Sequence, residues 1–294
     1  MWRIWLIRAA RLLASLIGVL VLVVLLAMAP KPPHGFVPFL SAFLAKFGAA
    51  FRGDFGNSSV TGAPALDGVM AVLPDTLQLL GGGALVAIAV GVPLGLVLSA
   101  SRTLRAAAPL IQIVAATPVF VAALALIWLS VRVLHWSEAS QASALSWTAL
   151  VKSQGWDAAL RVFALPALTV GAAGAASIQF ALRRAAATAL LAPYREGLRM
   201  MGLGALDIDI RYTLPEILAV LLRGLDDVAL ALISAAAVAE WVFHRSGAAV
   251  LFLRSVALGD WNIVAVVLAL FAVMTILVGF LGAAIAQIIV PEDT

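Results

Sequence analysis

Long apolar stretches constrain this chain more than any other feature. Five are strongly apolar and one is weaker, and a bilayer core about 30 Å thick needs roughly 20 apolar helical residues to cross it. Of the 294 residues, 64% are hydrophobic and 12% are charged, whereas a soluble domain carries about 25% charge. Since lipid offers the backbone no hydrogen bonds, the sequence predicts an all-α polytopic membrane protein with six transmembrane helices.

The six predicted spans are separated by polar or glycine-rich loops. They are Leu12–Met28, Thr76–Leu98, Leu110–Val131, Val162–Leu182, Ile217–Ala239 and Ile263–Ile289. We expect one transmembrane domain over residues 1–294, with an anchor helix at about 10–29, an outer loop at 30–72 and a core bundle at about 73–290. The first span resembles a signal peptide at Ala27-Met28-Ala29, but its length and Pro30 favour an uncleaved anchor. Gly171–Ala176 is all Gly and Ala, which predicts close helix packing.

The distribution of arginine predicts the orientation. Three segments hold more basic residues near helix ends than the other loops do. They are the N-terminal segment, the loop between the second and third spans, and the loop between the fourth and fifth spans. The positive-inside rule then puts both termini in the cytoplasm. The net charge of +4 is therefore assigned to topology and membrane lipid, and no nucleic-acid partner is expected.

Several kinds of chemistry lack their residues in this sequence. There is no cysteine, and His34, His135 and His244 lack metal-ligand spacing, so no metal site is predicted. No Gly-Lys-Ser/Thr phosphate loop is present, so the chain is not expected to bind ATP in that manner. No nucleophilic constellation is found, and the protein is predicted not to be an enzyme.

The most informative polar segment is residues 183–215, between the fourth and fifth spans. Tyr194–Met201 predicts a short amphipathic helix after Pro193, and Gly202 is suited to end it. Glu196 and Arg199 are three residues apart, so they can pair or face a partner together. Spacing alone fits an ordinary solvated helix equally well.

Ionisable residues inside predicted spans form a second group of candidates. Asp226 and Asp227 enter the fifth span near mid-membrane, with Arg223 on the same helical face. They either form a neutralised packing cluster or line a substrate cavity. Glu240, at the outer end, is a gate residue or an interfacial charge, and Gln179 in the fourth span lines a cavity or makes packing hydrogen bonds.

Motifs in a fixed order carry a family resemblance from Gly53 onward. They are Gly53-Asp54-Phe55-Gly56, Leu73-Pro74-Asp75-Thr76-Leu77, Gly91-Val92-Pro93-Leu94-Gly95, Tyr194 to Leu203 with Leu214-Pro215, Glu240-Trp241-Val242-Phe243 with Gly247, and Asp260-Trp261. Through the order and spacing of these motifs, the chain resembles permease subunits of binding-protein-dependent ABC importers. More narrowly, it is similar to the dipeptide/oligopeptide/nickel family. Gly197, Leu198, Met200 and Met201 depart from the residues usual in that loop.

The resemblance implies a type I ABC importer fold with a cytoplasmic coupling helix. The residues that it places at the ATPase are Tyr194, Arg195, Glu196, Gly197, Arg199, Gly202, Leu214 and Pro215. From their polarity within the predicted spans, Gln179, Arg223, Asp226, Asp227 and Glu240 are the residues expected to line the substrate pathway. The implied partners are a second homologous permease, two cytoplasmic ABC ATPases that hold ATP and Mg²⁺, and an extracytoplasmic substrate-binding protein.

The expected location is the bacterial cytoplasmic (inner) membrane. The substrate stays open between a peptide, a metal chelate, an opine and another small solute. Two alternatives also stay open: an ion-coupled secondary transporter that uses Asp226 and Asp227, and an intramembrane enzyme or assembly factor, for which no site is found.

Overall fold

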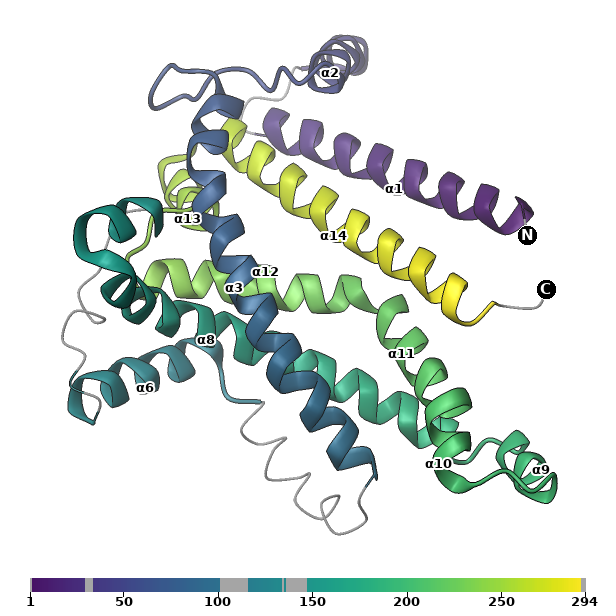
Figure 1. The fold of residues 1–294 in the computed structure, drawn as a ribbon. Coiled ribbons are helices and arrows are strands. Elements are labelled where there is room, and N and C mark those ends of the chain that lie inside the picture. Colours follow the sequence, from purple (N-terminus) through teal and green to yellow (C-terminus); the bar gives the residue numbers. More distant parts are fainter. Residues whose placement is uncertain (1, 30–33, 101–115, 134, 136–146, 292–294) are drawn as a thin grey trace. The chain divides into compact units, whose positions relative to one another are not determined.

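A computed structural model describes residues 2–29, 34–100, 116–133, 135 and 147–291 (Figure 1). All regular elements in these ranges are helical apart from one isolated bridge between Asn57 and Pro64. The helices are α1 (Trp2–Met28), α2 (Phe36–Phe51), α3 (Ala65–Ala100), α6 (Val119–Arg132), α8 (Trp147–Ala189), α9 (Tyr194–Met200), α10 (Ala205–Ile208), the π-helix η1 (Asp209–Thr213), α11 (Leu214–Arg223), α12 (Leu225–Val242), α13 (Ala248–Leu258) and α14 (Trp261–Ile289). The prediction of an all-α polytopic membrane protein is confirmed.

The chain divides into two compact units, whose boundaries cut through α3, α8, α12 and α14. The first unit consists of Met1–Gln78, Gln141–Leu160 and Glu240–Ile276, and the second of Leu79–Ser140, Arg161–Ala239 and Leu277–Thr294. The residues that follow are therefore described within one unit at a time.

In the second unit, α3 and α8 pack through small residues. A Cβ on Gly83 would lie 2.5 Å from Val170, and one on Gly91 would lie 2.9 Å from the Ala175 backbone. On Gly95 it would meet Leu182 at 2.9 Å. Contacts that begin at Gly83 with Val170 and end at Gly95 with Leu182 follow the same order along both helices, so α3 and α8 run parallel. The predicted role of the Gly/Ala tract in helix packing is confirmed.

That parallel arrangement bears on the predicted third span. Two spans that run the same way need a return crossing between them. The connection contains α6, which is only 14 residues long, and residues 110–115 of the predicted span lie outside the described residues. Leu110–Val131 therefore stays a prediction.

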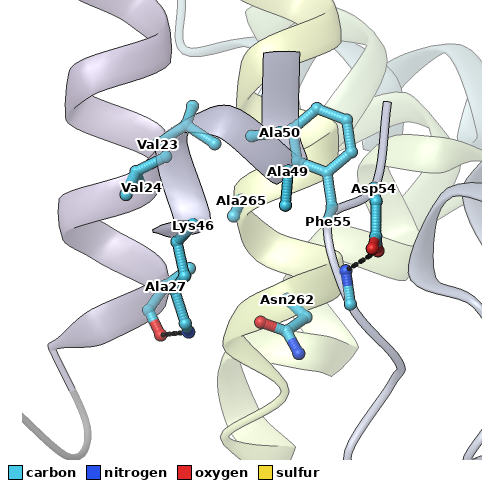
Figure 2. A pocket seen from close by; sticks show the side chains of 11 residues that line it. Val23, Val24, Ala27, Lys46, Ala49, Ala50, Asp54, Phe55, Asn262 and Ala265 are labelled. Carbon is cyan, nitrogen blue, oxygen red and sulfur yellow. Dashed lines mark hydrogen bonds between the residues drawn. The ribbon is translucent and has the colours of Figure 1, made fainter. Parts of the chain in front are cut away.

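In the first unit, α1, α2 and α14 pack through alternating apolar contacts. Val23 of α1 lies with Ala265 and Ala269 of α14, whereas Val24 and Met28 pack on Ala50 of α2. A pocket of about 240 Å³ lies among these helices and the loop after α2. Figure 2 shows its polar contacts: Lys46 Nζ donates to the Ala27 carbonyl at 3.4 Å, and Asp54 Oδ1 accepts from the Gly56 N–H at 2.9 Å.

Within the described residues, four helices are long and apolar enough to cross a membrane: Leu6–Met28, Ala65–Ser99, Gly155–Ala189 and Trp261–Ile289. They contain or overlap the first, second, fourth and sixth predicted spans. Two begin well before the predicted residue, because Pro74 lies inside α3 without ending it and α8 continues back to a break at Gly155, where φ is +85°.

The fifth predicted span, Ile217–Ala239, is wrong as a single helix. α11 ends at Arg223, and Gly224 has φ −107° and ψ 25°, so the chain turns before α12 begins at Leu225. Charged residues gather at this break and interrupt the apolar run. The short helices α2 and α13 were not predicted, because each lies in a segment interpreted as loop.

Candidate functional site

The loop after α8 folds into three short helical segments that lead into α11. α9 begins directly after Pro193, whose φ of −59° and ψ of −27° already suit a helix. It ends in a Schellman motif: Leu203 N–H donates to the Leu198 carbonyl and Gly202 N–H to the Arg199 carbonyl. Gly202 has φ +87°. The predicted helix is present within one residue of its expected bounds.

Gly202 is needed for its backbone conformation and not for space. A Cβ built on it has no heavy atom within 4 Å. The left-handed φ nevertheless disfavours other residues at that position. The same open surroundings are found at Gly197, in the middle of α9.

Side chains tie α9 to the segments that follow it. Arg195 is buried, its Nη1 donates to Thr213 Oγ1, and its Nη2 lies 2.7 Å from Asp209 Oδ1. Tyr194 Oη donates to Glu216 Oε2 at 2.7 Å. Partial burial, together with that hydrogen bond, raises the pKa of the Tyr194 hydroxyl, which therefore stays a donor. These bonds attach α9 to both η1 and α11.

This loop also carries exposed apolar side chains. Met200 and Met201 are 81% and 77% exposed, and Leu206 and Leu191 are also largely exposed. Glu196 and Arg199 are exposed, and no ion pair joins them in the described residues. Whether the two side chains face a partner together stays a prediction. Leu214 and Pro215 begin α11 and are half-buried.

The acidic pair of the fifth span lies in the first turn of α12, just after the break. Asp226 and Asp227 are exposed in this chain, and the Asp226 Cβ lies against Gly279 of α14. Arg223 Nη2 donates to the Val290 carbonyl at 3.4 Å, beyond the end of α14. One contact of the arginine is thus directed at the end of another helix. Whether the acids line a pathway stays a prediction.

Gln179 lines a pocket of about 330 Å³ between α3, α6 and α8, together with Thr117 and Thr169. It is 2% exposed, and its Oε1 has no hydrogen-bond partner in the described residues. Thr169 donates to the Leu165 carbonyl of its own helix at 2.9 Å. The structure places Gln179 in the lining of this pocket, and whether it contacts a solute there stays a prediction.

Glu240 is the most buried acid of the described chain, at 1% exposure. Its Oε1 accepts from Thr76 Oγ1 at 2.6 Å and its Oε2 from the Val250 N–H at 2.9 Å. Thr76 Oγ1 in turn accepts from the Ala248 N–H at 2.7 Å. The carboxylate therefore caps the N-terminus of α13, directly and through Thr76.

Gly247 and Arg245 complete this cluster. A Cβ on Gly247 would lie 2.1 Å from the Glu240 carboxylate, so only glycine leaves room for the acid. Arg245 is buried beside it, and burial lowers the pKa of its guanidinium against the influence of Asp75 and Glu240. Asp75 accepts from Ser246 Oγ at 2.7 Å. Glu240 is thus no simple interfacial charge but the centre of a buried network.

Comparison with known families decides the identity. The family described as the binding-protein-dependent transport system inner membrane component matches residues 83–292. This match covers more than two thirds of the chain. The chain belongs to this family. A comparison with curated proteins finds no match.

Membership makes the protein a permease component of binding-protein-dependent ABC transport, located in a membrane. Such permeases associate with an ATPase and a binding protein, and the family component is a membrane permease that is generally not itself catalytic. The predicted membership is confirmed, and the narrower peptide/nickel assignment stays a prediction.

Sequence reasoning missed several residues that organise this permease. Thr76 and Asp75 belonged to a quoted motif, but nothing in the sequence indicated that they contact Glu240 and Ser246, 164 and 171 residues away. Asp260 was likewise quoted without a role, yet it accepts hydrogen bonds from Ser58 Oγ and from the Ser59 N–H. Arg195 is predicted to lie on a coupling surface, whereas the structure shows it buried.

Proposed function

We propose that this chain is the permease subunit of an ATP-driven importer. It would form, with a second homologous permease, the pathway for a peptide-like or other small solute delivered by an extracytoplasmic binding protein. Two cytoplasmic ATPases would hydrolyse ATP with Mg²⁺. The chain would lie in a bacterial inner membrane with both termini in the cytoplasm, as the arginine distribution favours.

The observation that carries the proposal is α9, a short helix fixed on one side and exposed on the other. Arg195 and Tyr194 hold it to η1 and α11. Met200 and Met201 project from it as adaptable apolar side chains. A partner that engages these methionines would displace α9 together with α11, and α11 continues through Gly224 into α12.

The substrate pathway is proposed to include Gln179 and the acids at the start of α12. The exposure of Asp226 and Asp227 and the place of Gln179 in a pocket lining support this proposal, since polar groups within membrane spans usually face a bundle interior or water. Glu240 is better supported as a structural cap than as a group in contact with solute, since its carboxylate is buried and hydrogen-bonded.

Co-purification tests the proposal. Met200→Asp/Met201→Asp places two acids on the proposed docking surface without disturbing the buried face of α9. When expressed from its native gene neighbourhood, the wild-type chain should retain an ATPase through purification, and the double variant should lose it. Val60→Asp, at an exposed position before α3, is the control and should retain it. Equal retention by the double variant would contradict docking on α9.

A further inference from the structure

A basic pocket lies in the second unit where α3 and α8 end. It has a volume of about 270 Å³ and is lined by Leu98, Ser99, Phe180, Arg183, Arg184, Ala186, Ala187 and Leu190. Both helices are long enough to span a membrane. The pocket therefore lies at one end of two spanning helices, on the side where α8 leads into the α9 loop.

Its charge is positive and not balanced by the residues that line it. Among the described residues that line it, Arg183 and Arg184 are the ionisable ones, and none is an acid. Within the part of the chain that the structure describes, Arg183 Nη1 is buried and has no hydrogen-bond partner. A buried guanidinium nitrogen without an acceptor is costly, so an anion in this pocket would stabilise it.

The other lining residues suit an amphiphile. The Arg184 guanidinium lies 5.7 Å from the centre of the Phe180 ring, which keeps the charge beside an exposed aromatic surface. Phe180 is about half exposed and can contact an acyl chain. Ser99 Oγ donates to the Gly95 carbonyl at 2.6 Å, which leaves its oxygen able to accept.

We propose that this pocket binds the phosphate of an anionic phospholipid, with Arg183 and Arg184 on the phosphate and Phe180 beside the acyl chain. Basic pockets between spanning helices are suited to such head groups. The position before the α9 loop means that a bound lipid would hold the end of α8, from which that loop departs. The inference concerns lipid binding and does not depend on which solute is transported.

Lipid titration of the full chain, purified with its co-purifying subunits, tests this inference. The midpoint of thermal unfolding is followed during additions of dioleoylphosphatidylglycerol, dioleoylphosphatidylcholine and inorganic phosphate. Only phosphatidylglycerol should raise the midpoint. An equal effect of phosphatidylcholine would show that charge is irrelevant, and an equal effect of inorganic phosphate would assign the pocket to a free anion. Either result would overturn the proposal.

Variants locate the effect. Arg183→Gln/Arg184→Gln should weaken the apparent affinity for phosphatidylglycerol by about thirtyfold, since each of the two basic residues near an anionic surface contributes about 1 kcal/mol. Arg8→Gln/Arg11→Gln removes the same charge from α1 and should leave that affinity unchanged. Equal losses in the two double variants would contradict a specific pocket.

A variant that keeps both arginines tests the pocket even if the Arg183→Gln/Arg184→Gln protein is not produced in folded form. Ala187 is exposed at the pocket, so Ala187→Trp should fill it and reduce lipid binding, whereas Ala187→Ser should not. Undiminished binding in Ala187→Trp would overturn the assignment.

Discussion

The α9 loop and the Glu240 cluster both hold a short helix in place with side chains, but they do so in opposite ways. In the α9 loop one buried arginine and one tyrosine secure the helix, and Glu196, Arg199 and two methionines are left exposed. In the Glu240 cluster the carboxylate, Thr76 and the α13 backbone satisfy one another inside the fold. The first arrangement leaves a surface for a partner, whereas the second stabilises the chain itself.

This contrast predicts where substitutions lower stability and where they lower coupling. Substitutions around Glu240 should reduce the folded amount of protein. Those in α9 should leave folding largely intact and reduce communication with the ATPase.

The largest effect is expected for Glu240→Ala. It leaves the Val250 N–H and the Thr76 hydroxyl without their acceptor and removes the acid beside Arg245, at a cost of about 3 kcal/mol. The unfolding midpoint in detergent and the yield should both fall. Glu196→Ala, an exposed acid on α9, is the matched control and should not change the midpoint. Similar midpoints for the two variants would remove the distinction between the regions.

Gly247→Ala should cost about 1–3 kcal/mol by overpacking against the Glu240 carboxylate. Its φ of 172° is accessible to any residue, so the cost is steric. The substitution should therefore cost much less in a Glu240→Ala background. Additive losses in this double-mutant cycle would show that the two residues act independently.

Arg195→Ala should lower stability by about 1.5 kcal/mol, since the Asp209 end of its ion pair is partly solvated. ATPase stimulation by substrate should fall far more than the protein yield. Arg211→Ala is the control: its 3.8 Å pair with Asp207 is exposed and should contribute less than about 0.5 kcal/mol. Stimulation that survives in Arg195→Ala would mean that α9 needs no attachment to η1.

Gly202→Ala should have the smallest effect, about 1 kcal/mol, because a left-handed φ is imposed on alanine in otherwise open space. Asn tolerates this conformation better, so Gly202→Asn should retain more coupling than Gly202→Ala. A Gly202→Asp variant that couples as the wild type does would show that the end of α9 is free to change.

The sequence predicted the helical membrane architecture and the α9 helix because both depend on local signals. A long apolar stretch indicates a membrane span, and Pro193 and Gly202 indicate the start and the end of a short helix. The packing of Gly171–Ala176 was predictable for the same reason, since small residues in a membrane helix let a neighbouring helix approach closely. The break at Gly224 was missed because a glycine beside charges was treated as part of a span.

What could not be predicted depends on distant partners. The pairing of Thr76 with Glu240 joins residues far apart in sequence, and no periodicity encodes it. The burial of Arg195 likewise depends on Thr213 and Asp209, which only the fold of η1 brings beneath α9. A charge in a polar loop is interpreted as exposed unless its partners are known.

Site-specific cross-linking tests the central claim most directly. The chain contains no cysteine, so Met200→Cys introduces a single reactive thiol at the exposed end of α9, and Val60→Cys provides the control thiol. The account predicts a cross-link from residue 200 to the co-expressed ATPase, with a lower yield when Arg195→Ala is added, and none from residue 60. An ATPase that co-purifies yet never cross-links to residue 200 would contradict the claim that α9 is its docking helix.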